Sequence, residues 1–307
     1  MWYYQAFGLQ IGSDVELLQL PKSNLTKAEI QIKMGDVPLN LEGNYIDYHW
    51  IKIKDKEVLF KVEGIASYYI KNGDEITVKI EGKMSEENSP LIQMYLMGTA
   101  MGALLIQRSI IPLHGSCIRR KDGKTILFTG DSGAGKSTTA AYFLGEGWSI
   151  LSDDVTPTQI EKDSVIAYPS FPQQKLWDDA LERHDLEEKK VRLLLSEELR
   201  KKYSIHNDNK FYDKKESLDI VIQLVPKEQN IIKYREIMGV EKAILLREHT
   251  YRNFLYADNK LKQMHFQQCA KMAEKLRIFQ ICRPIGINTE KQIYEIIELL
   301  LEGSSYE

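Results

Sequence analysis

The sequence is poor in the features that mark several protein classes. Only 3 of its 307 residues are cysteines, widely spaced and without a C-x-x-C pair. This excludes a disulfide scaffold, argues against a cysteine-based zinc site and indicates a reducing compartment. An excess of positive charge is also missing, because 41 basic residues stand against 44 acidic ones and the formal net charge is −3. A protein that coats DNA would carry a clear basic excess.

Targeting signals are missing as well. The first residues, MWYYQAFGLQIGSD, contain no basic stretch followed by an apolar one, so no signal peptide is expected. One apolar run, Leu91–Gln107, carries Gly98 and Gly102 at small-xxx-small spacing and reaches the short limit for a membrane span. We predict instead a buried core helix at about residues 88–109. We therefore expect a cytoplasmic protein with neither a membrane nor a nucleic-acid partner.

What the chain does contain is typical of a globular protein of about two domains, with 43% hydrophobic and 28% charged residues. Residues 1–85 alternate apolar with polar side chains, and the runs end at Gly, Asn or Asp. This period predicts a β-rich N-terminal domain, and Asn72-Gly73 predicts a hairpin turn within it. Strand edges can pair with an extended chain, so we regard residues 1–85 as a possible substrate-recognition domain.

Residues 86–307 alternate strand-like with helix-like runs, which predicts an α/β domain. Strands are expected at Leu218–Pro226 and Glu241–His249. A charged helix is expected at Asp178–Lys202, with Leu193–Leu195 turned inward. Two more helices are expected near Asn259–Lys275 and Thr289–Glu302.

The strongest motif in this second part is a phosphate-binding loop. It fits G-x-x-x-x-G-K-[ST] and lies between an apolar strand, Thr125–Thr129, and a helix that starts at Ser137. In such a loop the backbone N–H groups and the helix N-terminus face phosphate oxygens, the lysine reaches the β- and γ-phosphates, and the serine ligates Mg²⁺. The residues predicted to bind the nucleotide are Gly130, Asp131, Ser132, Gly133, Ala134, Gly135, Lys136, Ser137 and Thr138.

A phosphate-binding loop does not by itself name a reaction. The sequence contains no N-K-x-D motif for guanine, no L-S-G-G-Q motif of transport ATPases, and neither H-R-D nor D-F-G of eukaryotic-type protein kinases. These absences leave small-molecule kinases, other protein or peptide kinases, and nucleotide-dependent switches.

An acidic pair follows the loop early. Asp153 and Asp154 close the apolar run WSIL, and Asp153 comes 16 residues after Ser137. One helix, a turn and one strand fit into that distance, so the next strand would deliver both carboxylates to the loop. Adjacent side chains on an extended strand point to opposite sides. One carboxylate could thus support Mg²⁺ while the other accepts the proton of an attacking hydroxyl, and the spacing does not say which does which.

Other candidates are weaker when judged by residue type alone. His114 precedes the loop, and a single histidine near an apolar strand is more often a core residue. In FPQQKLW, Trp177 is expected to be a packing residue. Lys175 could approach a phosphate or a peptide carboxylate, but we expect a solvated lysine. Arg252 in HTYR is a better candidate, because phosphoryl transfer needs positive charge and a basic residue could also bind a substrate carboxylate. His249 is weaker still.

Taken together, L-H-G-S, the Lys-Asp-Gly turn, G-D-S-G-A-G-K-S-T and S-D-D-V resemble the catalytic domain of the HPr kinase/phosphorylase superfamily. The resemblance implies an α/β P-loop catalytic domain, residues 86–307, beside a smaller β-rich domain. It also implies that ATP and Mg²⁺ are used. Asp153 would be the base that activates a serine hydroxyl, and His114 would assist near the γ-phosphate. Ser137 with Asp154 would support the metal, and Lys136 with Arg252 would supply positive charge.

The similarity extends to YYQAFGLQIGSD, YPSFPQQKLWDDA and LREHTYRNFL, which resemble HPr-kinase-like proteins of peptide biosynthesis. Of these, the lasso peptide precursor kinases are the most similar group, and they phosphorylate a C-terminal serine. HPr kinases proper have a glycine-rich signature after the acidic pair, whereas this chain has no glycine between Gly147 and Gly239. This departure argues against HPr as the substrate and against the reverse, phosphorylase reaction.

The leading hypothesis is an ATP- and Mg²⁺-dependent kinase that acts on a serine of a ribosomally made peptide, most simply its C-terminal serine. A kinase for a small metabolite such as free serine is the second hypothesis. A nucleotide-dependent regulatory or binding module, which would hydrolyse ATP without a phosphorylated acceptor, is the third.

Overall fold

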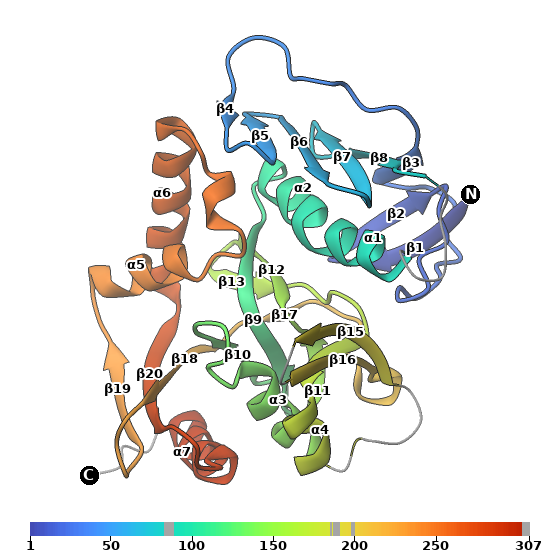
Figure 1. Cartoon of the computed structure of the whole chain (residues 1–307). Helices are drawn as coiled ribbons and strands as arrows, with labels where there is room; N and C mark the ends of the chain where they lie inside the picture. The colour runs from blue at the N-terminus through green and yellow to red at the C-terminus, as the bar shows by residue number, and fades with distance from the viewer. Residues whose placement is uncertain (83–88, 185, 187–190, 198–199, 303–307) are drawn as a thin grey trace. The chain divides into compact units, whose positions relative to one another are not determined.

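We describe the fold from a computed structural model of the chain (Figure 1). The residues described are 1–82, 89–184, 186, 191–197, 200–302. The contacts between residues divide the chain into two units, Met1–Pro112 with Thr250–Gln268, and Leu113–His249 with Cys269–Glu307. This division differs in place from the predicted boundary at residue 85. The apolar helix that follows the first sheet packs against that sheet, and the backbone N–H of Tyr251 donates to the Pro112 carbonyl.

The first unit contains an eight-stranded sheet in the order β1-β2-β3-β8-β7-β6-β5-β4. The alternating pattern of residues 1–85 predicts these strands, and the turn at Asn72-Gly73, where both residues have positive φ, joins β7 to β8 as expected. The strands are β1 Trp2–Ala6, β2 Leu9–Ser13, β3 Ile30–Met34, β4 Ile46–Asp47, β5 Ile51–Lys54, β6 Glu57–Val62, β7 Ala66–Lys71 and β8 Glu75–Ile80.

The apolar run forms a continuous helix, Ser89–Gln107, made of α1 (Ser89–Tyr95), a π-helical turn (Leu96–Ala100) and α2 (Met101–Gln107). By length and composition alone it could cross a membrane, but 67% of its most apolar window is buried inside the protein. It packs on β7, where the Tyr68 hydroxyl donates to the Ile92 carbonyl at 3.0 Å. This burial is what the core-helix prediction requires.

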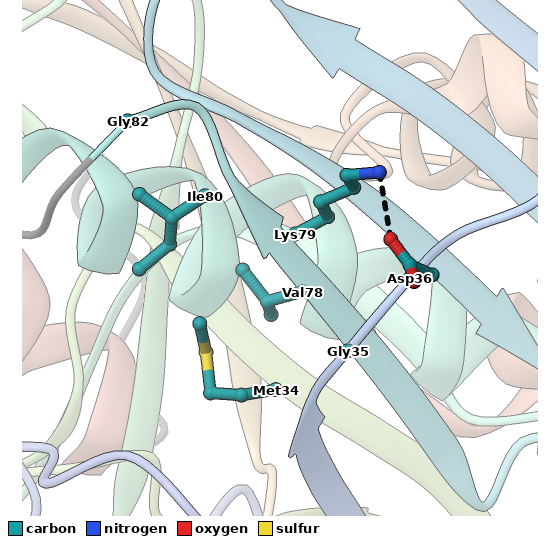
Figure 2. Close-up of a pocket in the computed structure, with 7 residues that line it drawn as sticks. All are labelled: Met34, Gly35, Asp36, Val78, Lys79, Ile80 and Gly82. Carbon is teal, nitrogen blue, oxygen red and sulfur yellow. Dashed lines mark ion pairs between the residues drawn. The ribbon is translucent and has the colours of Figure 1, made fainter.

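One pocket of the first unit lies beside the parallel strands β3 and β8. Figure 2 shows Lys79 and Asp36 at its rim, where their side chains form an ion pair of 2.7 Å. Met34 and Val78 supply its apolar lining. None of the predicted site residues lines this pocket.

The second unit contains a nine-stranded sheet in the order β17-β13-β12-β9-β10-β18-β20-β19, with β11 paired to β9. β10 runs parallel to β18, and β18 runs parallel to β20, while β9 is antiparallel to β10. The strands are β9 Ile111–Arg119, β10 Thr125–Thr129, β11 Ser149–Ser152, β12 Val155–Glu161, β13 Ser164–Ala167, β17 Glu216–Ser217, β18 Ile220–Lys227, β19 Lys233–Ile237 and β20 Arg277–Pro284.

Helices α3 (Lys136–Gly145) and α7 (Glu290–Glu302) pack on this sheet around a core of Phe128, Phe143 and Ile297. Fully buried aromatic and branched side chains on both layers remove apolar surface from water, and this burial holds helix and sheet together. The result is the mixed α/β fold that alternating strands and helices predict. The predicted tail helices are also confirmed as α6 (Asn259–Lys275) and α7.

Two predicted elements are wrong. Of the predicted helix Asp178–Lys202, α4 (Asp178–Arg183) is helical, whereas Val191–Glu197 and residues 200–202 belong to a three-stranded sheet in the order β14-β16-β15. Residues 185, 187–190 and 198–199 of this prediction lie outside the described residues. The reason is a period of two in KYSIH, which places Tyr203 and Ile205 in an apolar cluster on one face of that sheet. Leu193, expected inside, is 47% exposed. The strands are β14 Gln173–Trp177, β15 Val191–Glu197 and β16 Arg200–His206.

The predicted strand at Glu241–His249 is helix α5 (Val240–Glu248). Glu, Lys, Ala and Leu in EKAILLRE favour a helix intrinsically, and Ala243, Leu245 and Leu246 bury one side of it. A short apolar run does not distinguish a strand from a buried helix by itself.

Candidate active site

The predicted phosphate loop has the geometry that phosphate binding requires. It leaves β10 at Thr129 and enters α3 at Lys136, and Gly130, Gly133 and Gly135 all have positive φ. At Gly130 a Cβ atom would lie 2.5 Å from the Leu224 carbonyl oxygen, so only glycine fits there. The loop therefore presents its backbone and the N-terminus of α3 at the carboxyl edge of parallel strands, where α/β sheets bind ligands.

Lys136 is buried inside the loop, with 8% of the residue exposed. Its ammonium donates to the Gly130 carbonyl at 2.8 Å and to the Asp131 carbonyl at 2.9 Å. Burial lowers the pKa of Lys136, and the nearby acidic pair opposes this effect. The same donors can serve phosphate oxygens, so Lys136 lies where the sequence predicts it. Of the remaining loop residues, Asp131, Ser132 and Gly133 are exposed, while Ala134 is buried.

The acidic pair lies beside the start of α3, as the spacing predicts. Asp153 follows β11 and is 5% exposed. One carboxylate oxygen accepts from the Ser137 hydroxyl at 3.0 Å and from the Ser116 hydroxyl at 2.5 Å, and the other accepts from the Lys175 backbone N–H at 2.8 Å. Burial raises the pKa of Asp153, and these hydrogen bonds oppose the rise. A carboxylate whose pKa is raised is a better proton acceptor.

Asp154 has a different environment although it is the next residue. Its carboxylate forms an ion pair of 2.6 Å with the Lys175 ammonium, and the other oxygen lies 3.5 Å from the His114 ring. Burial alone would raise the pKa of Asp154, but the charges of Lys175 and His114 outweigh burial and lower it. Asp154 therefore stays ionised. Lys175, expected to be solvated, is 20% exposed and belongs to this cluster, which corrects the sequence analysis.

His114 lies on β9, next to the end of β10. Its backbone N–H donates to the His249 carbonyl at 2.8 Å, its carbonyl accepts from the Thr129 hydroxyl at 2.8 Å, and its ring nitrogen Nδ1 is 3.0 Å from the Asp154 carbonyl. Burial lowers the pKa of His114, and the charge of Asp154 opposes this effect. The sequence prediction that His114, Lys136, Ser137 and the acidic pair converge agrees with this arrangement.

The metal-binding prediction pairs Ser137 with Asp154, whereas the structure joins Ser137 to Asp153. The role of Asp154 as a metal ligand stays a prediction. Among the described residues no group of three His, Cys, Asp or Glu side chains is arranged so that it could hold a metal ion. Mg²⁺ usually keeps several waters and is held by one or two carboxylates together with substrate phosphates. A serine hydroxyl beside a carboxylate at the phosphate loop fits that ion.

Sequence reasoning missed Arg283 and Gln223, and it gave little weight to His249. Arg283, at the end of β20, donates from Nε to the Ala134 carbonyl at 2.9 Å and packs against Gly135. His249 bonds through Nε2 to the Gln223 amide at 3.0 Å. Gln223 and Arg283 lie on β18 and β20, which pair in parallel beside β10, and no motif in the sequence predicts their positions.

Arg252 belongs to the first unit, has a left-handed backbone with φ of 53°, and its guanidinium lies 5.4 Å from the Tyr251 ring centroid. Its catalytic role stays a prediction. Thr138 lies in the first turn of α3, as predicted.

Comparison with known proteins adds little to this site. No family profile and no curated protein matches the chain. One solved structure that matches is the Hpr(Ser) kinase/phosphatase from Coxiella burnetii, with 12% identity and a TM-score of 0.31. The match covers 62% of this chain and 94% of that chain. At this TM-score it carries no argument, and the chemistry of the site follows from its own residues.

Proposed function

We propose that this protein is an ATP- and Mg²⁺-dependent kinase whose acceptor is a serine hydroxyl. The observation that carries the proposal is the hydrogen bond of 3.0 Å between Ser137 of the phosphate loop and the buried carboxylate of Asp153. This contact supports the proposal, because a buried carboxylate next to the loop serine could act as a proton acceptor beside the γ-phosphate.

The roles follow from the environments of the two acids. Asp153, whose pKa burial raises, takes the proton as the acceptor oxygen bonds to the γ-phosphorus. The bond from that phosphorus to the β-phosphate oxygen breaks at the same time, and ADP leaves. Lys136 and the loop N–H groups hold the phosphates, and Ser137 would hold Mg²⁺, which neutralises charge on the phosphate oxygens. His114 and Lys175 keep Asp154 ionised.

The acceptor we propose is the C-terminal serine of a ribosomally made peptide, of the lasso precursor kind. The support is the resemblance of YPSFPQQKLWDDA and LREHTYRNFL to the lasso peptide precursor kinases. A chain terminus is also flexible enough to reach the loop. The β-rich first unit remains a proposed recognition surface for such a peptide.

The decisive experiment is intact-mass analysis of a peptide ending in serine after incubation with the enzyme, ATP and Mg²⁺. We expect one added phosphoryl group, lost when the serine is replaced by alanine or Mg²⁺ is chelated. Asp153→Asn should lower the rate by about 100- to 10,000-fold, the usual contribution of a general base. Asp122→Asn is the matched control, because this exposed aspartate lies in the turn between β9 and β10.

Phosphorylation that survives Asp153→Asn would contradict the role of Asp153. ATP hydrolysis without any phosphorylated peptide would contradict the peptide-kinase proposal, and free serine would then be tested as acceptor. Hydrolysis with neither acceptor phosphorylated would favour the regulatory module.

A further inference from the structure

The small sheet β14-β16-β15 has two chemically different faces. Antiparallel pairing sets Lys175 opposite Ser204 and Trp177 opposite Lys202, and directly opposed residues share a face. The alternate residues Leu176 and Ile205 lie on the other face, where they pack against Ala141 of α3. The sheet therefore turns its apolar face to the helix and its polar face toward the acidic pair, which Lys175 contacts.

Lys202 has an unusual position on this polar face. Its ammonium lies 5.5 Å from the centroid of the Trp177 ring, and no described carboxylate pairs with it. A cation over an indole face is held in place while its donors remain available. Ser204, two residues further along, is fully buried, and its hydroxyl has no hydrogen-bond partner among the described residues.

The charge of Lys202 contributes to the pKa shifts of two residues in the candidate active site, Lys136 and Asp154. Burial lowers the pKa of Lys136 most, and Lys202 lowers it further. At Asp154, burial raises the pKa, while Lys175, His114 and, to a smaller extent, Lys202 lower it. The Lys202 ammonium therefore interacts electrostatically with Asp154, whose ion-pair partner Lys175 lies on the same face of the sheet.

We infer that Lys202, held over Trp177, binds the α-carboxylate of the acceptor serine. This inference rests on the proposed kinase function and specifies how it selects a chain terminus. A C-terminal serine has both a hydroxyl and the α-carboxylate of the chain end. When its hydroxyl lies beside Asp153, its negatively charged α-carboxylate therefore lies nearby. The acidic pair would repel that anion, and Lys202, which pairs with none of the carboxylates described, offsets the repulsion. An internal serine has a neutral amide there and gains nothing from Lys202.

The test compares two peptides that differ only at the end, a C-terminal serine as the free acid and as the amide. We expect the wild type to prefer the acid by about 10-fold or more in kcat/KM, as a charge-assisted contact would give. Lys202→Met should reduce this ratio to about one while leaving the KM for ATP unchanged. Lys202→Arg should restore part of it. Lys201→Met is the matched control, because Lys201 is exposed and adjacent residues of a strand face opposite sides.

The outcomes separate the two proposals. An active wild type that uses acid and amide equally, or a Lys202→Met variant that keeps the wild-type ratio, overturns the carboxylate subsite but not the kinase. A wild type that phosphorylates neither peptide overturns the proposed acceptor. In that case, calorimetry measures the affinity of the protein for the acid and amide peptides. Equal affinity for the two, or no binding of either, overturns the carboxylate subsite.

Discussion

Asp153 and Asp154 are neighbours in the sequence, yet their surroundings shift their pKa values in opposite directions. Burial raises the pKa of Asp153, since only hydroxyls and one N–H bond its carboxylate. Asp154 is also buried, but the charges of Lys175 and His114 outweigh burial. A pair of carboxylates with different acidities can serve a reaction that needs both a base and a fixed negative charge.

The Lys175–Asp154 ion pair gives a prediction about stability. Because the folded-state pKa of Asp154 is lowered, its contribution to stability is present above the unfolded-state pKa of about 4 and is lost as the pH falls. Lys175→Met leaves a buried carboxylate without its cation and should lower the free energy of unfolding by about 3 kcal/mol at pH 7. This loss should shrink toward pH 4, as Asp154 takes up a proton in the folded variant.

Urea unfolding of wild type and variant at pH 7 and pH 4 measures this effect. Lys124→Met, which removes the exposed ion pair with Asp219, serves as control and should cost about 0.5 kcal/mol or less. An equal loss at both pH values would show that Lys175 acts through packing and not through its charge.

At the scale of elements, the β9–β10 hairpin positions both His114 and the phosphate loop. Gly115 pairs with Thr129, and a Cβ atom on Gly115 would lie 2.2 Å from the Phe128 carbonyl oxygen. This oxygen belongs to the backbone, so it cannot move away by a change of rotamer as a side chain could. The two strands can approach this closely only with glycine after the histidine, which gives the H-G dipeptide a structural reason.

Gly115→Ala should therefore separate the strands at the site. We expect a loss of about 2 kcal/mol or more in the free energy of unfolding, the order of an overpacked core, together with weaker nucleotide binding. Gly145→Ala is the matched change in α3, where a Cβ would meet nothing within 4 Å. Alanine favours a helix over glycine, so it should be neutral or stabilising by up to about 1 kcal/mol. Thermal unfolding and ATP titration check both variants, and similar behaviour of the two would refute the close-approach argument.

At the scale of the molecule, the proposed nucleotide site belongs to one unit. The loop, the acidic pair and His114 all lie in the second unit, Leu113–His249 with Cys269–Glu307. Ligand binding stabilises the part that binds, by about 2.7 kcal/mol at 100 times the Kd. We expect ATP with Mg²⁺ to slow hydrogen exchange mainly in the second unit.

Hydrogen exchange read by mass spectrometry locates this protection along the chain. Lys136→Met should abolish it, because Lys136 is placed to hold the phosphates. Protection spread equally over both units, or retained by Lys136→Met, would contradict a nucleotide site confined to the second unit.

Much of the site was predictable because its determinants are local. The phosphate loop needs glycines, a lysine and a serine at fixed spacing, and the strand before it and the helix after it are short-range features. The short distance from Ser137 to the acids permits one helix and one strand, and the structure has α3 and β11 there. The N-terminal strands followed from their period of two, and the core helix from its apolar run.

The remainder depends on residues that are distant in the sequence. Lys175 resembles a surface lysine until β14 brings it to Asp154, and Arg283 reaches the loop only through the parallel pairing of β18 with β20. The patterns of Asp178–Lys202 and Glu241–His249 are ambiguous between helix and strand. Packing decides them, because the first contributes α4 and strands β15 and β16, and the second forms α5. The sequence by itself determined the loop and its acids, because backbone conformation and residue spacing are local. Only the tertiary structure decided which acid faces Ser137 and which cations surround the pair, because those contacts and pKa shifts arise from burial between distant segments.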